Sequence, residues 1–95
     1  MQIRYYTDPG HGWGKVKLSL LKELKLLAKI SFYSYIRGDY AYLEQDCDLP
    51  LFVEAMKEQG KIVTFRHYHT DRQSRIRYYN SYMNPLQGEY KHVFK

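Results

Sequence analysis

The strongest constraint on the fold is a hairpin signal near the middle of the chain. In "SFYSYIRGDYAYLEQ", residues 31–45, two runs of alternating β-forming residues flank a turn at Gly38, a pattern typical of two adjacent antiparallel strands. A two-residue loop of Arg37 and Gly38 would place Tyr35 opposite Tyr40, whereas a three-residue loop would shift the register by one residue. We expect the two-residue loop, which gathers four tyrosines on one face of the hairpin: Tyr33, Tyr35, Tyr40 and Tyr42.

One helix is expected on each side of this hairpin. From Leu18 the apolar residues follow a helical period, with five of them on one face: Leu20, Leu21, Leu24, Leu27 and Ala28. The stretch "DCDLPLFVEAMKEQG", residues 46–60, predicts a second helix with Asp48 as its N-cap and Gly60 as its C-terminal stop. The inner face of this second helix would carry Phe52, Ala55, Met56 and Gln59.

Three further strands complete the predicted order: residues 2–7, 13–17 and 61–69. The order β-β-α-β-β-α-β predicts an α+β fold with a mixed or antiparallel sheet. Both helices would pack on one face of this sheet and leave its other face open. The last of these strands begins with three apolar side chains, which indicate an interior position in the sheet: Ile62, Val63 and Phe65.

The length of 95 residues indicates a single domain, which we assign to residues 1–82. Residues 83–95 would form a C-terminal extension, either an edge strand or a partly disordered end. Cys47 is the single cysteine, which excludes an intramolecular disulfide and fits a reducing compartment. Charged residues interrupt the most apolar stretch, residues 18–30, so it does not predict a membrane span. We expect a soluble cytoplasmic protein without a membrane partner.

Charge is distributed in three blocks along the chain, whose net charge is +5. Residues 1–38 hold seven Lys/Arg and two acids, a balance of +5. Residues 39–60 hold one lysine and six acids, a balance of −5, and residues 61–95 again hold seven Lys/Arg and two acids. An acidic surface repels nucleic acid, so this bipolar pattern favours a protein surface of mixed charge as the partner.

No motif in the sequence predicts a reaction. The glycine-rich stretch at residues 10–15 lacks the spacing and the Ser/Thr of a P-loop, and we expect a turn that positions Trp13. His67 and His69 lie two apart on a predicted strand, which leaves a metal-dependent enzyme as an alternative. A third ligand would come from a distant part of the chain: His11, Cys47 or His92. We expect no catalytic residue, no metal and no cofactor.

Three acids at alternate positions follow the hairpin: Glu44, Asp46 and Asp48. We attribute them to a strand end and to the positive N-terminus of the second helix. Cys47 stands between two of these acids, which would raise the pKa of its thiol and make it a poor nucleophile.

The stretch "RHYHTDRQSRIRYYNSY", residues 66–82, has the densest binding chemistry, with four arginines, four tyrosines and a single acid. Arginine forks match phosphates and tyrosine rings stack on bases, but the same residue types dominate protein–protein hot spots. We take two patches as candidate partner-binding residues, the second being the four hairpin tyrosines. The first patch contains Arg66, Arg72, Arg75, Arg77, Tyr78, Tyr79 and Tyr82.

Three stretches together, "DPGHGW", "SFYSYIRGDYAYLEQDCD" and "HTDRQSRIRYYNSY", resemble a family of small accessory proteins of bacteriophages and mobile elements. The likeness runs over most of residues 8–82. It carries no catalytic or binding residue with it. What the resemblance implies is a context, because accessory phage proteins of this size often inhibit host defence or bind nucleic acid.

We therefore expect a non-enzymatic binding protein in a bacterial host cell. The first interpretation is an inhibitor of a host defence or nucleic-acid-handling complex, of the anti-CRISPR or anti-restriction class. Its partner would be a host protein or a protein–nucleic-acid complex. The alternative is a small single-stranded nucleic-acid-binding protein that uses the same arginines and tyrosines, with an affinity that falls steeply with salt.

Overall fold

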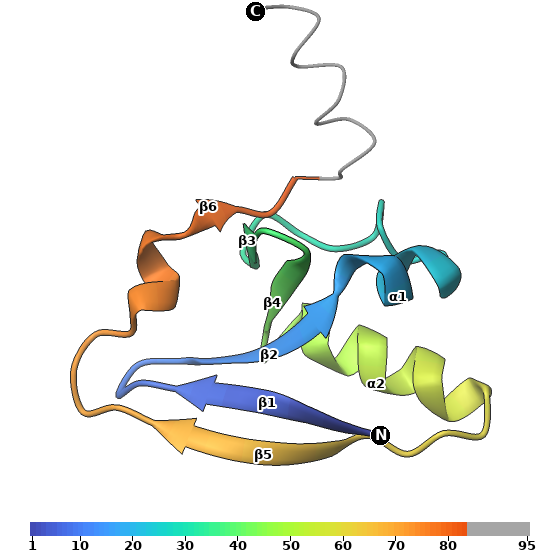
Figure 1. The fold of residues 1–95 in the computed structure, drawn as a ribbon, viewed down its shortest axis with the longest axis horizontal. Coiled ribbons are helices and arrows are strands. Elements are labelled where there is room, and N and C mark those ends of the chain that lie inside the picture. Colours follow the sequence, from blue (N-terminus) through green and yellow to red (C-terminus); the bar gives the residue numbers. More distant parts are fainter. Residues whose placement is uncertain (84–95) are drawn as a thin grey trace, which may run out of the picture.

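The computed structural model describes residues 1–83 and contains one mixed sheet, two α-helices and a 3-10 helix (Figure 1). The helices are α1 (Leu18–Glu23) and α2 (Asp48–Glu58), and the 3-10 helix covers Arg75–Tyr78. The strands are β1 (Gln2–Thr7), β2 (Gly12–Lys17), β3 (Tyr35–Arg37), β4 (Tyr40–Glu44), β5 (Thr64–His69) and β6 (Asn80–Ser81).

The strands are ordered β5-β1-β2-β4-β3-β6 across the sheet. The β1–β5 pair is parallel, and the other neighbouring pairs are antiparallel. The predicted α+β class and the predicted order of elements are confirmed, with the 3-10 helix and the short β6 as additions. The predicted C-terminal extension lies outside the described residues from residue 84 onward.

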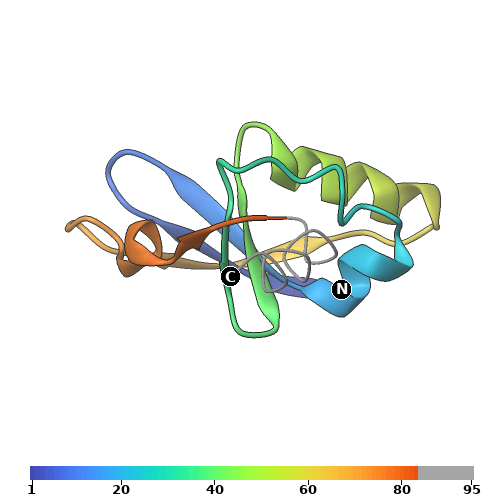
Figure 2. The ribbon, with the colours of Figure 1, turned by 90° about the horizontal axis from the view of Figure 1, so that it is seen from above.

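The main hydrophobic core lies on one face of the sheet. Helix α2 packs on this face, and α1 contributes to the same core beyond the end of β2 (Figure 2). Leu21 of α1 and Phe52 of α2 are both fully buried, in one cluster with Val16 and Leu43 of the sheet. Burying these large side chains away from water supplies most of the driving force for folding.

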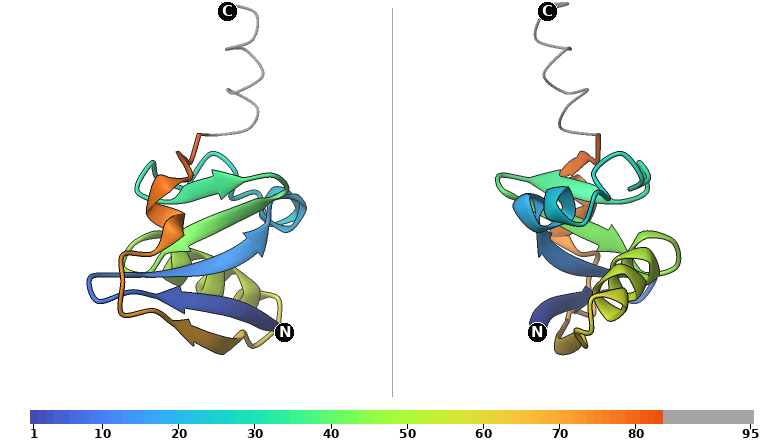
Figure 3. Two further views of the ribbon diagram at one scale, coloured as in Figure 1. Left: turned by 60° about the vertical axis from the view of Figure 1, so that its left-hand side comes forward. Right: turned by 90° about the vertical axis from the view of Figure 1, so that its right-hand side faces the viewer.

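The opposite face of the sheet is partly covered, contrary to the open face that the sequence predicts. Residues 70–79, here called the crossing segment, pass over one end of this face (Figure 3, left). Ile76 of the crossing segment is buried in a second hydrophobic cluster with Trp13 and Tyr42. Trp13 is 1% exposed, so the glycine-rich stretch does position this ring, as expected.

The β3–β4 hairpin has the predicted loop length but a register shifted by two residues. Its loop is Gly38–Asp39 instead of Arg37–Gly38, and Tyr35 lies opposite Tyr42. Gly38 has a φ of +58°, which a type II′ turn requires at its first loop position. A shift of two residues preserves which side chains share a face, so three of the four hairpin tyrosines still lie together. Tyr33 precedes β3 and is exposed.

Helix α1 is much shorter than its leucine pattern predicts, because the chain turns out of the helix at Lys25. Lys25 has a φ of +60°. The N–H of Leu26 donates to the carbonyl of Leu21 at 2.8 Å, and the N–H of Lys25 donates to the carbonyl of Lys22 at 3.0 Å. These two bonds form a Schellman motif, in which the left-handed position is usually a glycine. Helix α2 ends in the same way, with the expected Gly60 at a φ of +74°.

Asp48 does not cap α2 as predicted, because its carboxylate is turned into the protein. Cys47 occupies the N-cap position, without a side-chain capping bond. Asp48 is buried and accepts hydrogen bonds from the backbone N–H of Ser31 and from the hydroxyls of Ser31 and Ser34. The carboxylate therefore fixes the loop before β3. At the other end of the predicted inner face of α2, Gln59 is exposed.

Strand β5 lies at an edge of the sheet, so the predicted interior position is wrong. Ile62 precedes the strand and is 78% exposed, and Phe65 is 36% exposed, whereas Val63 is buried. Of the three apolar residues, Val63 alone is buried. Strand β5 pairs with β1 on one side and has no neighbouring strand among the described residues on the other.

Candidate functional site

The sheet face opposite α2 collects the positive charge of the strands. Side chains alternate between the two faces of a strand, and the register between neighbours fixes which side chains share a face. All five Lys/Arg of the described strands fall on this face, together with five of their six tyrosines. We call it the basic tyrosine face, and its members are Arg4, Tyr6, Lys15, Lys17, Tyr35, Arg37, Tyr40, Tyr42, Arg66 and Tyr68.

Several cations on this face lie against tyrosine rings. The Nζ of Lys15 is 4.2 Å from the centre of the Tyr40 ring. The guanidinium carbons of Arg4 and Arg66 are each 5.7 Å from the centre of the Tyr68 ring. Such contacts orient a cation without neutralising it. The positive charge of the face therefore stays available to an anionic partner.

The crossing segment joins this face at its hairpin end. The ring of Tyr79 packs 5.1 Å from that of Tyr42. The guanidinium of Arg37 lies 4.9 Å above the same Tyr79 ring. The crossing segment and the hairpin residues Tyr42 and Arg37, which the sequence presents as separate, thus meet on one surface.

A buried aspartate fastens the crossing segment to the β1–β2 loop. Asp8 accepts two hydrogen bonds from Arg77, at 2.6 Å from Nε and 2.9 Å from Nη2. It also accepts from the backbone N–H groups of Ser74, Gly10 and His11, each at 2.9 Å. We call this arrangement the Asp8 clasp. A two-pronged arginine–carboxylate pair of this kind is among the stronger hydrogen-bonded contacts in proteins.

The electrostatics of the clasp favour the charged forms of both partners. The hydrogen bonds from Arg77 hold the pKa of Asp8 far below its usual range, with further lowering by the three backbone N–H groups. Together they outweigh burial, which alone would raise the pKa of Asp8. The same pair raises the pKa of Arg77, whose guanidinium also lies 5.1 Å above the Trp13 ring. Arg77 therefore serves the protein's own structure.

The remaining predicted binding residues differ in how accessible they are. Four are exposed to solvent on or beside the basic tyrosine face: Arg66, Arg72, Arg75 and Tyr78. Three are half-buried there: Tyr35, Tyr40 and Tyr79. Tyr33 lies outside the sheet, and Tyr42 is 8% exposed.

Tyr82 lies in the main core, on the helix side of the sheet, where a partner cannot reach it. Its side chain is 2% exposed, and its hydroxyl donates to the carbonyl of Leu27 at 2.5 Å. Burial raises the pKa of Tyr82 to about 12. We therefore leave Tyr82 out of the candidate surface.

Sequence reasoning did not select six members of the face, four of them cationic: Arg4, Tyr6, Lys15, Lys17, Arg37 and Tyr68. The sequence signal for four of them was the spacing in "QIRYYT" and "GKVK". Arg4 and Tyr6 are two residues apart, as are Lys15 and Lys17, so each pair lies on one side of its strand. That alternation could not show which strands are neighbours. The strand order was needed to bring these side chains together.

Two hollows on the basic tyrosine face are lined by Lys15. The larger, of about 640 Å³, runs beside the crossing segment and is here called the strap groove. Its lining residues are Tyr6, Lys15, Tyr42, Thr70, Arg72, Gln73, Ser74, Arg75, Ile76, Tyr78 and Tyr79. A second hollow, of about 410 Å³, includes Arg4, Lys15, Lys17 and Tyr40. Within residues 1–83, neither hollow is lined by an acid.

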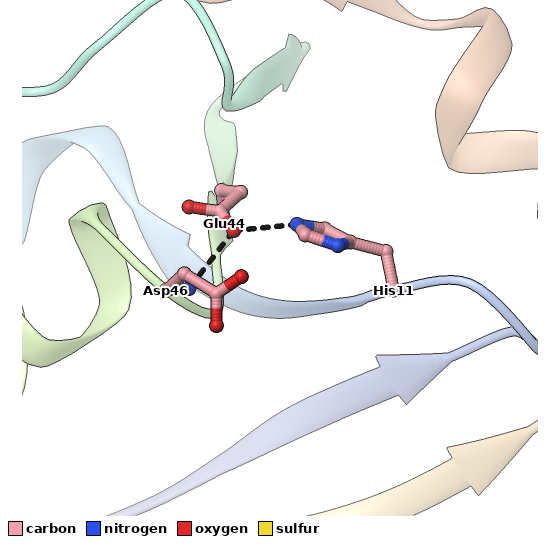
Figure 4. A group of neighbouring side chains, drawn as sticks. All are labelled: His11, Glu44 and Asp46. Atoms are coloured by element: carbon pink, nitrogen blue, oxygen red, sulfur yellow. Dashed lines mark hydrogen bonds and ion pairs between the residues drawn. The ribbon is translucent and has the colours of Figure 1, made fainter.

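One group of side chains has the composition of a metal site: His11, Glu44 and Asp46 (Figure 4). The Nε2 of His11 lies 2.5 Å from Oε1 of Glu44, closer than the roughly 3.3 Å between two ligands that each lie about 2 Å from a tetrahedral zinc. Glu44 also accepts hydrogen bonds from the N–H groups of Asp46 and Cys47. Burial alone would raise the pKa of Glu44, but these bonds and His11 lower it. The carboxylate thus joins the β1–β2 loop to the start of α2.

The other reactive side chains do not assemble into a catalytic set within residues 1–83. His69 places Nδ1 2.8 Å from Thr7 Oγ1 and Nε2 3.1 Å from Asp71 Oδ1. His67 lies edge-on to Tyr5 at 5.2 Å, and the candidate ligand His92 lies outside the described residues. Desolvation and the nearby Glu44 raise the pKa of Cys47, in the direction expected from the sequence.

Comparison of the chain with protein-family models, with curated proteins and with solved structures gave no match. None of the helices within residues 1–83 has the length and apolar character needed to cross a membrane. The arguments for function therefore come from the chemistry of the site.

Proposed function

We propose that the protein binds single-stranded nucleic acid on its basic tyrosine face. The observation that carries the proposal is the segregation of side chains by the strand register. Every Lys/Arg of the described strands lies on the side that carries five of their six tyrosines. Cations that contact phosphates and aromatic rings that stack on bases are the two components of single-strand binding surfaces.

Five acids of residues 1–83 are placed where they do not oppose such a ligand, although the acids argue against it in the sequence. Glu54 and Glu58 are exposed on α2, on the far side of the sheet. Asp8 and Glu44 are buried in hydrogen-bonded pairs. Asp71 of the crossing segment pairs with His69, and it does not line either hollow. The exposed acids of α2 therefore lie away from the basic tyrosine face, which weakens the main objection to a nucleic-acid partner.

A single strand fits this face better than a duplex does. Tyrosine rings contribute to binding when they stack on unpaired bases, whose faces a duplex hides. The crossing segment also stands above the sheet at one end of the face (Figure 3, left). The ligand would follow the face beside this segment. We place this binding in the cytoplasm of a bacterial cell, because an exposed free cysteine such as Cys47 stays reduced there.

Fluorescence anisotropy with labelled single-stranded and duplex oligonucleotides tests the proposal. Seven cations on or beside the face have no ion pair with an acid of residues 1–83: Arg4, Lys15, Lys17, Arg37, Arg66, Arg72 and Arg75. Full use of them would give a slope of about −5 for log affinity against log salt on a single strand. We expect a slope between about −2 and −5, and weaker binding to duplex.

Charge-matched variants distinguish the face from a general effect of net charge. The double variant Arg72→Ala/Arg75→Ala should weaken binding and make the salt slope less steep by about 1.4, the share of two phosphate contacts. The control Lys57→Ala/Lys61→Ala removes two exposed lysines from the helix side and should change neither quantity much. Equal losses in both variants, or no binding at low salt, would contradict the proposal.

A second candidate function is the inhibitor of a host defence complex expected from the sequence, and one observation favours it. Phe32 and Tyr33 are 67% and 60% exposed, with their rings stacked 4.6 Å apart. Asp48 fixes their loop, and exposed aromatic pairs of this kind serve as anchors in protein interfaces. Phage plating on hosts with a restriction or CRISPR system would test this function, with Phe32→Ala expected to abolish the protection.

A further inference from the structure

We infer that the strap groove holds one unstacked nucleotide, with its base against the tyrosine rings and its phosphate near the cations. This inference rests on the proposed function and makes it more specific. It states that the protein recognises bases as well as the charged backbone. A surface that used charge alone would bind any single-stranded polyanion, with or without bases.

The lining of the strap groove carries more than a phosphate site needs. Lys15, Arg72 and Arg75 would satisfy a phosphate by themselves. The rings of Tyr42 and Tyr79 add flat apolar surface that a phosphate does not use but a base does. The volume of about 640 Å³ also lies within the range of roughly 300 to 1,000 Å³ typical of small-molecule sites. A nucleotide satisfies both the cationic and the aromatic part of this lining.

The groove is formed before any ligand arrives, because the crossing segment is held at two points. Ile76 is buried in the second hydrophobic cluster, and the Asp8 clasp holds the backbone N–H of Ser74 and the fork of Arg77. A wall that is already ordered lowers the entropy cost of binding. Tyr6, Lys15 and Tyr42 of the hydrogen-bonded sheet form the other side of the groove.

Tyr78 is the accessible aromatic ring at this groove. It is 75% exposed, and its hydroxyl donates to the side-chain oxygen of Gln73 at 3.1 Å. Both residues line the groove, so the hydrogen bond holds the ring at its rim. Since the ring buries little surface in the fold, removing it should affect a stacked base and leave stability almost unchanged.

The test compares two labelled strands of about 12 nucleotides, an oligothymidylate and a strand of the same length in which every base is absent. Anisotropy at low salt measures the affinity of each strand for the wild-type protein and for Tyr78→Ala. We expect the base-free strand to bind the wild type roughly 5- to 150-fold more weakly, the loss of one stacked base. Tyr78→Ala should weaken the oligothymidylate at least fivefold and leave the base-free strand unchanged.

The control variant is Tyr33→Ala, which removes an exposed tyrosine outside the basic tyrosine face and should bind both strands like the wild type. Equal affinities of the wild type for the two strands would overturn the inference, while backbone binding, and with it the proposed function, would stand. An equal loss in Tyr78→Ala and Tyr33→Ala would also overturn it. If neither strand binds even at low salt, both the inference and the proposed function are wrong.

Discussion

Replacing Asp8 by asparagine should destabilise the protein through the Asp8 clasp. Removing one partner of a buried ion pair costs about 3–5 kcal/mol, because the other charge stays buried without its counterpart. The Arg77 side chain is 29% exposed, so water can partly solvate it after the change. We therefore expect a loss of about 2–3 kcal/mol in the free energy of unfolding. For a chain of 95 residues, this corresponds to a fall of roughly 10–20 °C in Tm.

Trp13 provides the assay, since it is the single tryptophan of the chain. Its ring is 1% exposed and lies beneath the guanidinium of Arg77. Urea unfolding followed by Trp13 emission gives the free energy of unfolding, and the native-state emission reports whether the crossing segment has lifted. The matched control is Asp71→Asn, an aspartate in the same segment with a 98% exposed side chain. It should cost less than about 0.5 kcal/mol.

The effect of Asp8 should depend on pH with a definite sign. The folded state lowers the pKa of Asp8, so the carboxylate contributes its full stability above the unfolded value of about 3.9. This contribution diminishes as the pH falls below that value. The difference between wild type and Asp8→Asn should therefore be constant from about pH 7 to 5 and become smaller below pH 4. Equal stabilities of the two proteins at pH 7, or a difference that grows in acid, would refute the reasoning.

Two further changes test the helix end and the core. Lys25→Gly should stabilise the protein by about 0.5–1 kcal/mol in urea unfolding, because Lys25 holds a φ of +60° that glycine adopts without strain; a loss of stability would contradict the Schellman assignment. Tyr82→Phe should cost about 1–2 kcal/mol at pH 7, because the carbonyl of Leu27 loses its donor. Since folding raises the pKa of Tyr82 to about 12, its stabilising effect is complete below pH 10 and is lost between pH 10 and 12. The difference between wild type and Tyr82→Phe should therefore become smaller over that range, and a constant difference would argue against a buried hydroxyl.

The order of elements could be predicted because it depends on local signals. The alternating pattern of the hairpin, the change to a helical period at Leu18 and the stop at Gly60 are each complete within a few residues of sequence. Even the hairpin error was small. The loop moved by one residue, because Gly38 takes the first loop position with a positive φ. The pairing register therefore shifted by two residues, which leaves the faces unchanged.

The errors in the fold arise where a distant contact decides the local structure. The leucine pattern continues beyond Glu23, yet Leu26 and Leu27 are buried outside α1, because the chain turns at Lys25 to reach the same core. No residue type at Lys25 signals this turn. Asp48 has the chemistry of an N-cap, but Ser31 and Ser34 engage its carboxylate from a loop more than ten residues away. Local propensity could not anticipate either outcome.

The candidate site shows the same division between local pattern and tertiary arrangement. The residue types of the crossing segment predict a binding element, since arginine and tyrosine suit both phosphates and bases. The sequence of this segment cannot show that Arg77 pairs with Asp8, because the two residues are 69 positions apart in the chain. It also cannot show that Arg4, Lys15 and Lys17 complete the surface, because that depends on the neighbours of β1 and β2.

The structural role of the crossing segment and its proposed role in binding depend on different side chains, so stability and binding can be tested separately. Ile76 and Arg77 fasten the segment to the sheet, while Arg72, Arg75 and Tyr78 stay exposed on its surface. A bound anion is attracted to cations that are not already paired, so Arg77 contributes little to it directly. The clasp instead holds the segment whose Arg72 and Arg75 line the strap groove together with Lys15. A cation that is paired inside the protein is not available to a ligand. A residue that is mobile before binding adds an entropy cost when the ligand orders it. Dividing the two tasks between different side chains avoids both losses.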